Sequence, residues 1–427
     1  MSTQFLRDLP PRHAKGDTVG ITSVCSAHPT VVEAAFSHGL QHDGPVLIEA
    51  TCNQVNQDGG YTGMTPADFR TFVEGIAANV GFDTSRLILG GDHLGPNPWK
   101  HLPAEEAISK AEAMVDAYVR VGFTKIHLDT SMGCAGESEA LPDEITAARA
   151  ARLAMASEKA ASNCDFDAPV YIIGTEVPIP GGAIEALDHL QVTGADAAVK
   201  TVDIHRAAFS KLGLEEAFER ALGVVVQPGV EFGNEDVVVY QRDKARELSK
   251  VLKDIPQFIF EAHSTDYQPL SALAGLVQDG FAILKVGPGL TFALREALYG
   301  LDHIADVLQP VNVEQTLRGT MERLMLSDAK NWSKYYHGTE EELRLQRHFS
   351  YSDRIRYYWP QRESVEAVRN LFARLDGRTI PETLISQYLG TLYPAVATGT
   401  LAATPHSLTI AAVQQVLSTY ESAAHPI

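Results

Sequence analysis

The sequence predicts an α/β fold, a TIM (β/α)8 barrel over residues 1–310 followed by a helical C-terminal extension over residues 311–427 packed on the barrel. Three observations carry this prediction. Eight short apolar or β-branched runs alternate with helical patterns over residues 18–300, and strand patterns stop near residue 310. The length of 427 residues also suits a barrel with an appended part. Eight consecutive βα units favour a closed barrel over the alternative, a doubly wound open sheet.

The expected strands are short runs of the kind that fills a parallel sheet covered on both faces. In chain order they lie at residues 19–21, 46–48, 87–89, 126–128, 170–173, 224–226, 258–260 and 283–286. The spacing between successive runs leaves room for a helix and its connections in every unit.

Two of the intervening helices have clear ends. One is expected to begin at Pro66 and to bury one apolar face, since proline is favoured at the first helical position. Another begins after Pro103 and stops at Gly122, a residue type common just past a helix end. In the extension, the helical period predicts helices at residues 313–330, 340–347, 364–375 and 408–420.

The charge, the apolar runs and the cysteines of the sequence exclude several kinds of binding partner and indicate where the protein works. The formal net charge of −19 argues against nucleic acid or an anionic membrane as partner. No apolar run approaches the roughly 20 residues of a membrane span, and the first residues lack the apolar core of a signal peptide. Four widely separated cysteines are typical of reduced thiols. We therefore expect a cytoplasmic protein.

Polar and charged side chains gather around the C-terminal ends of the expected strands, the face where α/β barrels place their active sites. They are Ser23 and His28, Glu49 and Asn53, Asp92 and His93, Asp129 and Ser131, Glu176, Gln227 and Glu231, Glu261 and His263, and Lys285. Alternation within strands directs some of them outward, so not all can share one cavity. So many polar groups at one face still predict a functional site.

Binding of a divalent metal ion is the simplest function for these strand-end residues. His93 and His263 offer imidazole, and Glu176 and Asp129 offer carboxylate, which suits zinc, manganese or cobalt. Such an ion would polarise a ketose carbonyl when the C3–C4 bond breaks. Asp92 would then take the proton of the C4 hydroxyl as general base, with Asp129 and Glu176 as further catalytic candidates.

The remaining strand-end residues are expected to bind substrate: Glu49, Asn53, Ser131, Gln227 and Lys285. Lys285 would neutralise a phosphate or an oxyanion, and a Schiff-base lysine is the alternative. Structural roles also stay open, with Asp92 as a cap and His93 as a hydrogen-bonded core histidine.

Three further segments have weaker patterns. Residues 53–63 form a polar, glycine-rich loop, read as a lid, a substrate clamp or a structured connection. The turn Gly287-Pro288-Gly289 precedes a helix, whose N-terminus could hold an anion. Arg354 and Arg356 lie among aromatic residues and favour a packing and salt-bridge element over a nucleotide site. The P-loop pattern Gly-x-x-x-x-Gly-Lys-Ser/Thr is absent, so no nucleotide cofactor is expected.

Several long motifs resemble one family, the Z subunits of class II D-tagatose-1,6-bisphosphate aldolases. They are Glu49-Ala-Thr-Cys-Asn53-Gln-Val-Asn56, Gly91-Asp92-His93-Leu-Gly-Pro, Lys125-Ile-His-Leu-Asp129, Val226-Gln227-Pro-Gly-Val-Glu231-Phe and Tyr351-Ser-Asp-Arg354-Ile-Arg356-Tyr-Tyr-Trp359. The resemblance implies a non-catalytic barrel chain that supports a separate catalytic subunit in galactitol and N-acetylgalactosamine catabolism, and an oligomer. It also implies two alternatives, because some relatives are associated with metal-dependent ketose 4-epimerisation and others are labelled tagatose-6-phosphate kinases.

Catalytic class II chains differ from this sequence at two places. Asp92-His93 matches their base-and-ligand pair after the third strand, and His263 can serve for the histidine of the seventh. The sixth strand carries Gln227 in place of a histidine, and the phosphate-binding turns are replaced by His263-Ser-Thr-Asp266 and Lys285-Val-Gly-Pro. The resemblance therefore implies an accessory aldolase subunit first. The alternative is a metal-dependent ketose 4-epimerase or aldolase acting alone on a ketose or ketose phosphate, with a kinase as a distant third.

Overall fold

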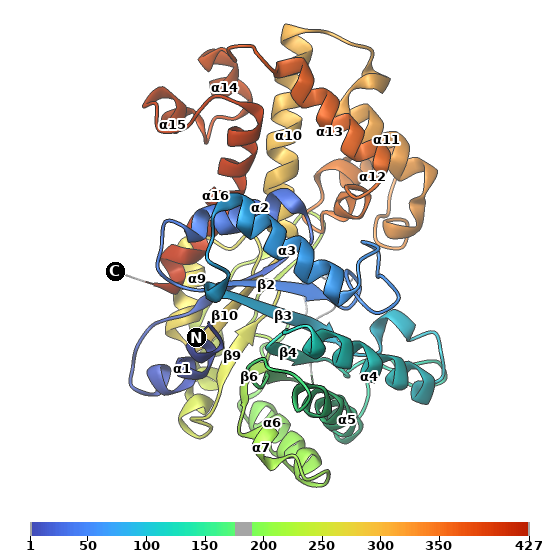
Figure 1. The fold of residues 1–427 in the computed structure, drawn as a ribbon, viewed down its shortest axis with the longest axis vertical. Coiled ribbons are helices and arrows are strands. Elements are labelled where there is room, and N and C mark those ends of the chain that lie inside the picture. Colours follow the sequence, from blue (N-terminus) through green and yellow to red (C-terminus); the bar gives the residue numbers. More distant parts are fainter. Residues whose placement is uncertain (1, 176–189, 426–427) are drawn as a thin grey trace.

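The chain folds into a closed parallel barrel in the computed structural model, which describes residues 2–175 and 190–425 (Figure 1). Within these residues, eight strands pair in the order β1-β2-β3-β4-β5-β6-β9-β10, and β10 pairs with β1. This confirms the predicted TIM barrel over the open sheet. The barrel strands are β1 Ile21–Cys25, β2 Val46–Thr51, β3 Leu87–Leu94, β4 Lys125–Leu128, β5 Val170–Ile173, β6 Ala221–Val225, β9 Ile259–Ala262 and β10 Phe281–Val286.

Helices surround the barrel, and further helices form the C-terminal part (Figure 1). In the barrel they are α1 Ser2–Ala14, α2 Pro29–Gly39, α3 Pro66–Val80, α4 Ala104–Arg120, α5 Asp143–Ala161, α6 Ala195–Ser210, α7 Glu215–Phe218, α8 Arg242–Lys250 and α9 Leu270–Gln278. In the C-terminal part they are α10 Pro288–Leu308, α11 Leu317–Ser327, α12 Glu340–Phe349, α13 Arg362–Leu375, α14 Glu382–Tyr388, α15 Tyr393–Ala397 and α16 Pro405–Ala424. A short antiparallel pair, β7 Glu231–Phe232 and β8 Val237–Val238, follows β6.

Two strands differ most from the expected runs. β1 begins at Ile21, where the expected run ended, because the N–H of Gly20 donates to the carbonyl of Ala424 at 2.9 Å. β3 continues past residue 89 to Leu94, so Asp92 and His93 lie within the strand. The sequence reading ended this strand too early because polar residues interrupt the apolar run, whereas the interior of this barrel is itself polar at that level.

The barrel interior changes from apolar to polar along the strands. At one level a buried cluster joins Leu6 and Leu9 of α1 to strand residues that include Ile21, Leu47, Ile88, Ile259 and Ile283. Two residues further along the same strands stand Ser23, Glu49, Gly90, Glu261 and Lys285. Since side chains alternate with a period of two, these residues face the same interior. Helix α1 contacts β3, β5, β6 and β9 beneath this cluster, so the polar levels open toward the other end.

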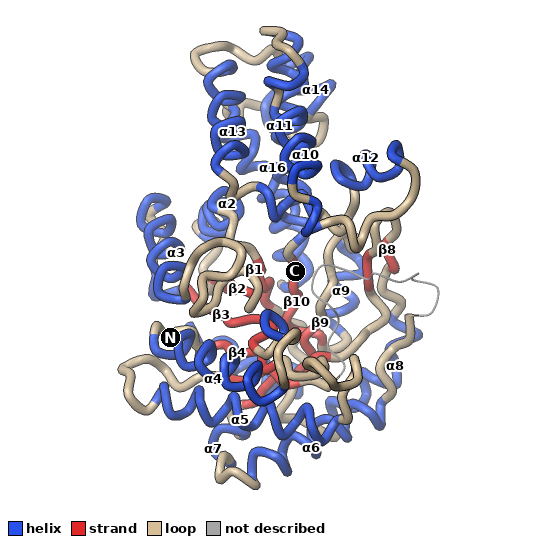
Figure 2. Tube along the Cα trace, turned by 90° about the vertical axis from the view of Figure 1, so that its right-hand side faces the viewer, coloured by secondary structure: helices blue, strands red, loops and turns tan. Residues whose placement is uncertain are grey.

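The C-terminal part begins where α10 leaves the barrel. Figure 1 shows α11, α13 and α14 beside the outer part of α10, away from the strands, and Figure 2 shows the same group from the side. The predicted helix over 313–330 is α11 between two short 3-10 turns, and the predictions at 340–347, 364–375 and 408–420 correspond to α12, α13 and α16. None of the described helices is long and apolar enough to cross a membrane.

The last helix, α16, returns to the barrel. It packs against α2, α9 and α10 and contacts β1. The hydroxyl of Tyr420 donates to the carbonyl of Thr265 at 2.6 Å, and the Thr265 hydroxyl donates to the carbonyl of Lys285 at 2.6 Å. The C-terminal helix is thereby tied to the backbone beneath the polar end of β10. The expected division at residue 310 stays a prediction.

Candidate active site

Four charged side chains form a fully buried layer inside the barrel, which we call the ion-pair layer: Glu49, Lys125, Glu261 and Lys285. The ammonium of Lys125 lies 2.6 Å from Glu49 and 2.7 Å from Glu261. The ammonium of Lys285 lies 2.5 Å from Glu49 and 2.6 Å from Oδ1 of Asp92. Because unpaired buried charges are very costly, the layer is stable only with both signs present.

The ion-pair layer keeps its lysines charged. Burial lowers the pKa of Lys125, but the carboxylates of Glu261 and Glu49 raise it above the usual value. The pKa of Lys285 is likewise lowered by burial, yet Asp92 and other acidic neighbours raise it well above the usual range. A Schiff base requires a neutral amine, so this environment opposes that role for Lys285.

One glycine makes room for the layer. Gly90 of β3 pairs with Glu49 of β2, and a Cβ atom at Gly90 would lie 2.6 Å from Cγ of Glu49. The glycine thus leaves the space that the Glu49 side chain occupies inside the barrel.

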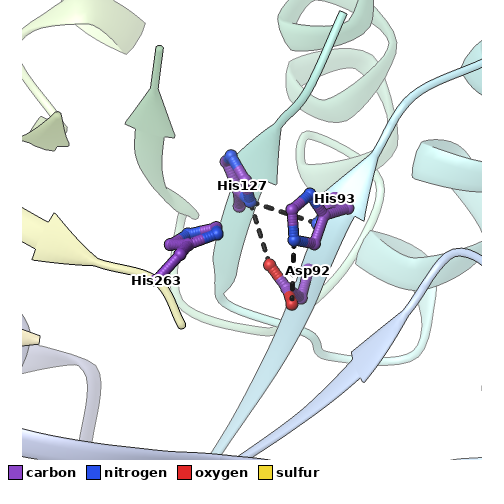
Figure 3. A group of neighbouring side chains, drawn as sticks. All are labelled: Asp92, His93, His127 and His263. Carbon is purple, nitrogen blue, oxygen red and sulfur yellow. Dashed lines mark hydrogen bonds and ion pairs between the residues drawn. The ribbon is translucent and has the colours of Figure 1, made fainter. Parts of the chain in front are cut away.

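Above the ion-pair layer stands the histidine cluster: Asp92, His93, His127 and His263 (Figure 3). One possible ligand atom from each residue lies within 4.8 Å of the others. The three imidazole centroids are 4.9 to 5.1 Å apart. Three imidazoles and a carboxylate suit zinc and related transition metals, so this group could hold a metal ion.

Carboxylates orient the histidines of the cluster, two of them from outside it and one, Asp92, from within it. Nδ1 of His93 lies 2.8 Å from Asp129, and Nε2 of His263 lies 2.9 Å from Glu261. Nδ1 of His127 lies 2.9 Å from Oδ1 of Asp92. Carboxylates that bind one ring nitrogen leave the other for a metal, which is the usual support of histidine ligands. The buried Nε2 of His127 has no hydrogen-bond partner in the described structure, which is consistent with a ligand position.

The local backbone of β3 brings both Asp92 and His93 to this site. His93 has φ of +48°, and the pairing of β3 with β4 shifts register between Gly91 and Leu94. A regular strand would direct two successive side chains to opposite faces. The irregularity instead lets Asp92 and His93 line the same cavity. Such strain for a non-glycine residue is typical of functional sites.

The electrostatics favour an ionised Asp92 and a neutral His263. Burial alone would raise the pKa of Asp92, but the neighbouring His93 and Lys285 charges lower it well below its usual value. Burial lowers the pKa of His263 to about 3, so this imidazole is neutral and available as a ligand at neutral pH.

The histidine cluster opens into a cavity of about 320 Å³, at the lower end of the range for small-molecule sites. Asp92, His93, His263 and Lys285 line its inner end. The end of β1 supplies Cys25, and the β1–α2 turn supplies His28. The β2 loop supplies Asn53 and Tyr61, and the C-terminal part supplies Arg356, Tyr357 and Trp359. The cavity is therefore built jointly by the barrel and the C-terminal part.

The other expected site residues lie at different places. Asp129 is buried behind His93, and the hydroxyl of Ser131 donates to Asp129 at 2.9 Å. Glu49 belongs to the ion-pair layer beneath the cavity. The side-chain oxygen of Gln227 accepts the N–H groups of Gly229 and Val230 and is thus turned onto its own loop. Glu176 lies outside the described residues, so its expected metal and catalytic roles stay predictions.

Three weaker patterns resolve differently. The N–H groups of Gly287 and Gly289 donate to Oδ1 of Asp266 at 2.9 and 2.7 Å, so the expected anion position is taken by the protein's own carboxylate. The loop over residues 53–63 is an internally bonded connection whose Asn53 and Tyr61 also line the cavity. Arg356 packs on the Tyr357 ring, as the aromatic surroundings predict, and it also lines the cavity.

Sequence reasoning missed two residues of the site, Lys125 and His127. The sixth strand offers no histidine to the cluster, and the third imidazole comes from His127 on β4. The missed signal was the spacing Lys125-x-His127-x-Asp129, because residues two apart on a strand face the same side. The prediction considered the residues that follow each strand, whereas Lys125 and His127 lie within β4 itself.

Comparison with known proteins identifies the family. The family model for "D-tagatose-1,6-bisphosphate aldolase subunit GatZ/KbaZ-like" matches residues 6–425. The chain belongs to this family. The resemblance noted in the sequence is thereby confirmed over nearly the whole chain.

Two relatives of the GatZ/KbaZ-like chain are similar over almost their full length. A protein of Agrobacterium fabrum named D-tagatose 6-phosphate 4-epimerase is 55% identical over 421 residues, covering 99% of this chain and 98% of the relative. A crystal structure from Sinorhizobium meliloti 1021, described as a probable tagatose 6 phosphate kinase, is 59% identical with a TM-score of 0.88. It covers 95% of this chain and 100% of its own.

Proposed function

We propose that this chain is a metal-dependent 4-epimerase that interconverts D-tagatose 6-phosphate and D-fructose 6-phosphate. The observation that carries the proposal is the histidine cluster. Asp92, His93 and His263 line a cavity of sugar-phosphate size, and the buried His127 completes the set of three imidazoles. The 55% identity to a protein named as a tagatose 6-phosphate 4-epimerase supports the choice of substrate.

The donor set fits a divalent metal ion. His93, His127 and His263 would hold it through ring nitrogens, with Asp92 beside them. A bound ion supplies Lewis-acid stabilisation of negative charge on the ketose oxygens. Asp129 and Glu261 hold the rings of His93 and His263 in position.

We assign the proton transfer of the reaction to Asp92. Its carboxylate faces the cavity and takes the proton of the C4 hydroxyl, while the C3–C4 bond breaks and its electron pair stays on the C1–C3 fragment. The C4 aldehyde then turns, C3 attacks its opposite face, and the new C4 oxygen recovers a proton. No atom is gained or lost, so the net change is inversion at C4.

The Lys285 ammonium keeps Asp92 ionised for this step. At 2.6 Å from Oδ1, it stabilises the carboxylate before the proton arrives. Oδ2 is not used by this ion pair, so it is the oxygen assigned to the C4 hydroxyl.

The test is to incubate the purified chain with D-tagatose 6-phosphate and a divalent metal, and to follow formation of D-fructose 6-phosphate by ¹³C NMR. The wild type should convert the substrate, and Asp92→Asn should lose about 100-fold or more in kcat. Asp243→Asn, on the exposed surface of α8, is the matched control and should retain activity. Inert wild type with a full complement of metal would contradict the proposal.

A second candidate function is an accessory subunit of tagatose-bisphosphate aldolase, favoured by the word "subunit" in the description of the matching family model. This function predicts that the chain extends the active lifetime of a separate catalytic subunit. Asp92→Asn should preserve that effect, whereas it abolishes epimerisation. Equal half-lives of the catalytic subunit with and without this chain would exclude the accessory role.

A further inference from the structure

The described residues that line the cavity include one arginine, Arg356, which the reaction at Asp92 does not use. Arg356 lies in the 3-10 turn Arg354–Tyr358 of the C-terminal part and lines the cavity with Tyr357 and Trp359. It is half-buried, whereas the neighbouring Arg354 is buried and stacks on Tyr335. Arg356 is thus the arginine of this turn that faces the site.

The contacts of Arg356 hold its guanidinium without neutralising it. Nη1 donates to the carbonyls of Ser352 and Asp353, and Nη2 donates to the hydroxyl of Tyr357 at 3.0 Å. In the described part of the chain, these hydrogen bonds go to carbonyls and a hydroxyl and not to a carboxylate. Nε and one N–H of Nη2 take no part in them, so donors remain for a ligand.

The nearby carboxylates make their hydrogen bonds to other groups, although the charge of Asp353 helps to raise the pKa of Arg356. Asp266 accepts the N–H groups of Gly287 and Gly289. Asp353 accepts the hydroxyl of Thr291 at 2.6 Å. A guanidinium that faces the cavity and makes no hydrogen bond to a carboxylate of the described residues attracts an anionic group by its local charge, although the net charge of the whole chain is −19.

Aromatic rings hold the arginine side chain in place. The guanidinium carbon lies 4.5 Å from the centroid of the Tyr357 ring, and Tyr357 meets Tyr61 of the β2 loop at 4.9 Å. Barrel loop and C-terminal part therefore meet at this arginine. A fixed, planar guanidinium matches phosphate oxygens better than a mobile ammonium would.

We propose that Arg356 is the specificity residue that binds the phosphate of the ketose phosphate, in the cavity that Asp92, His93 and His263 also line. The proposal rests on the proposed function for the identity of the sugar, but the binding of phosphate can be tested without catalysis. It assigns to the C-terminal part the phosphate recognition that the altered turns after β9 and β10 do not provide.

The experiment is calorimetric titration of inorganic phosphate into the full-length chain after dialysis against a chelator, so that phosphate cannot bind a metal ion. Wild type should bind phosphate, and Arg356→Met should bind it at least about tenfold more weakly, equivalent to about 1.4 kcal/mol. Arg356→Lys keeps the charge but loses paired donors, and it should fall between the two. Arg362→Met, an exposed position at the start of α13, is the matched control and should bind like wild type.

Kinetics separates this inference from the proposed function. With the metal-loaded enzyme, Arg356→Lys should raise KM for D-tagatose 6-phosphate and leave KM for D-tagatose unchanged. Phosphate binding that depends on Arg356 in a chain without epimerase activity would support the inference while the proposed function fails. Equal phosphate affinity of wild type and the Arg356 variants, or no phosphate binding at all, would overturn it. If Arg356→Met does not fold, Arg356→Lys alone decides.

Discussion

Within the ion-pair layer, Lys125 is the residue that pairs with two carboxylates at once, each within 2.7 Å. Its side chain is fully buried between Glu49 and Glu261. Lys285 lies 3.8 Å from Glu261 and cannot replace both contacts. The residue is therefore structural in its contacts, although it stands beneath the active site.

Lys125→Met should lower the free energy of unfolding by about 3–5 kcal/mol, because it leaves buried carboxylates without a partner. Urea unfolding followed by circular dichroism measures the loss. Lys100→Met, at an exposed position after β3, should change stability by less than about 0.5 kcal/mol. Equal stability of the Lys125 variant and wild type would contradict this, and would mean that water or a bound proton stabilises Glu49 and Glu261 in place of the ammonium.

Asp129 acts on the histidine cluster through His93. Asp129→Asn keeps the size of the side chain but removes the charge that faces Nδ1 of His93, so metal affinity should fall about 10–100-fold. Competition with a chelator of known affinity measures the change. Asp116→Asn, which affects only an exposed ion pair with Arg120, should leave the affinity unchanged. An unaltered affinity for Asp129→Asn would show that His93 is not a ligand.

At the scale of elements, the apolar runs predicted the number and order of the strands, because outward-facing residues pack under the helices whatever the interior holds. They could not predict that the strands continue through polar residues. Ser23, Glu49 and Glu261 were read as strand ends but lie inside β1, β2 and β9. These residues stay inside the strands because each pairs with residues of other strands. The sequence of one strand does not show which charged side chain will face it from across the barrel.

The candidate site was predictable in part for the same reason. Asp92, His93, His263 and Lys285 come together as expected because parallel strands bring their C-terminal ends to one face. His127 was missed because its only local signal is alternation with Lys125. Arg356 could not be placed, because nothing in a local pattern indicates that a distant turn folds back over the barrel.

The fit between β2 and β3 gives a prediction for Gly90. Gly90→Ala should destabilise the protein by about 1–3 kcal/mol, because the new methyl group would overlap Glu49 in a packed interior. Thermal unfolding compares it with Gly75→Ala in α3, where a Cβ meets nothing within 4 Å. Gly75→Ala should be neutral or stabilising, by up to about 1 kcal/mol. Equal melting temperatures for the two variants would contradict this account of Gly90.

The turn that carries Arg356 also makes stability depend on pH. Burial raises the pKa of Asp353 to about 7, although Arg295 lowers it in part. Between its unfolded pKa, about 4, and the folded value, the folded state binds more protons than the unfolded state. Stability attributable to Asp353 therefore falls as pH rises through this window, by at most about 1.4 kcal/mol per pH unit, and is constant above it.

Asp353→Asn should remove this dependence. The unfolding free energy of wild type should therefore fall relative to that of the variant as pH rises from 4.5 to 7. Urea titrations at half-unit pH steps measure it. Glu363→Gln, at an exposed position in α13, provides the matched control and should run parallel to wild type. A difference that stays constant across the window would contradict the raised pKa.

For the whole molecule, the C-terminal part and the barrel depend on each other at two places. Arg356, Tyr357 and Trp359 complete the cavity, and α16 packs beside α2, α9 and β1. The chain therefore leaves the barrel at α10 and returns to it with its last helix. The boundary at residue 310 stays a prediction, and these contacts join the residues on its two sides.

Removal of residues 405–427 tests this dependence. Leu408, Val413 and Leu417 of α16 are buried, and truncation would expose the faces of α2 and α9 that cover them. The truncated chain should lose cooperative unfolding, because the lost burial is comparable to the whole stability of a domain. Leu417→Ala is the milder variant and should cost about 2–5 kcal/mol, against less than about 0.5 kcal/mol for the exposed Val365→Ala. A truncated chain that unfolds cooperatively at the wild-type temperature would instead favour an independent barrel ending near residue 310, because the barrel would then need nothing from α16.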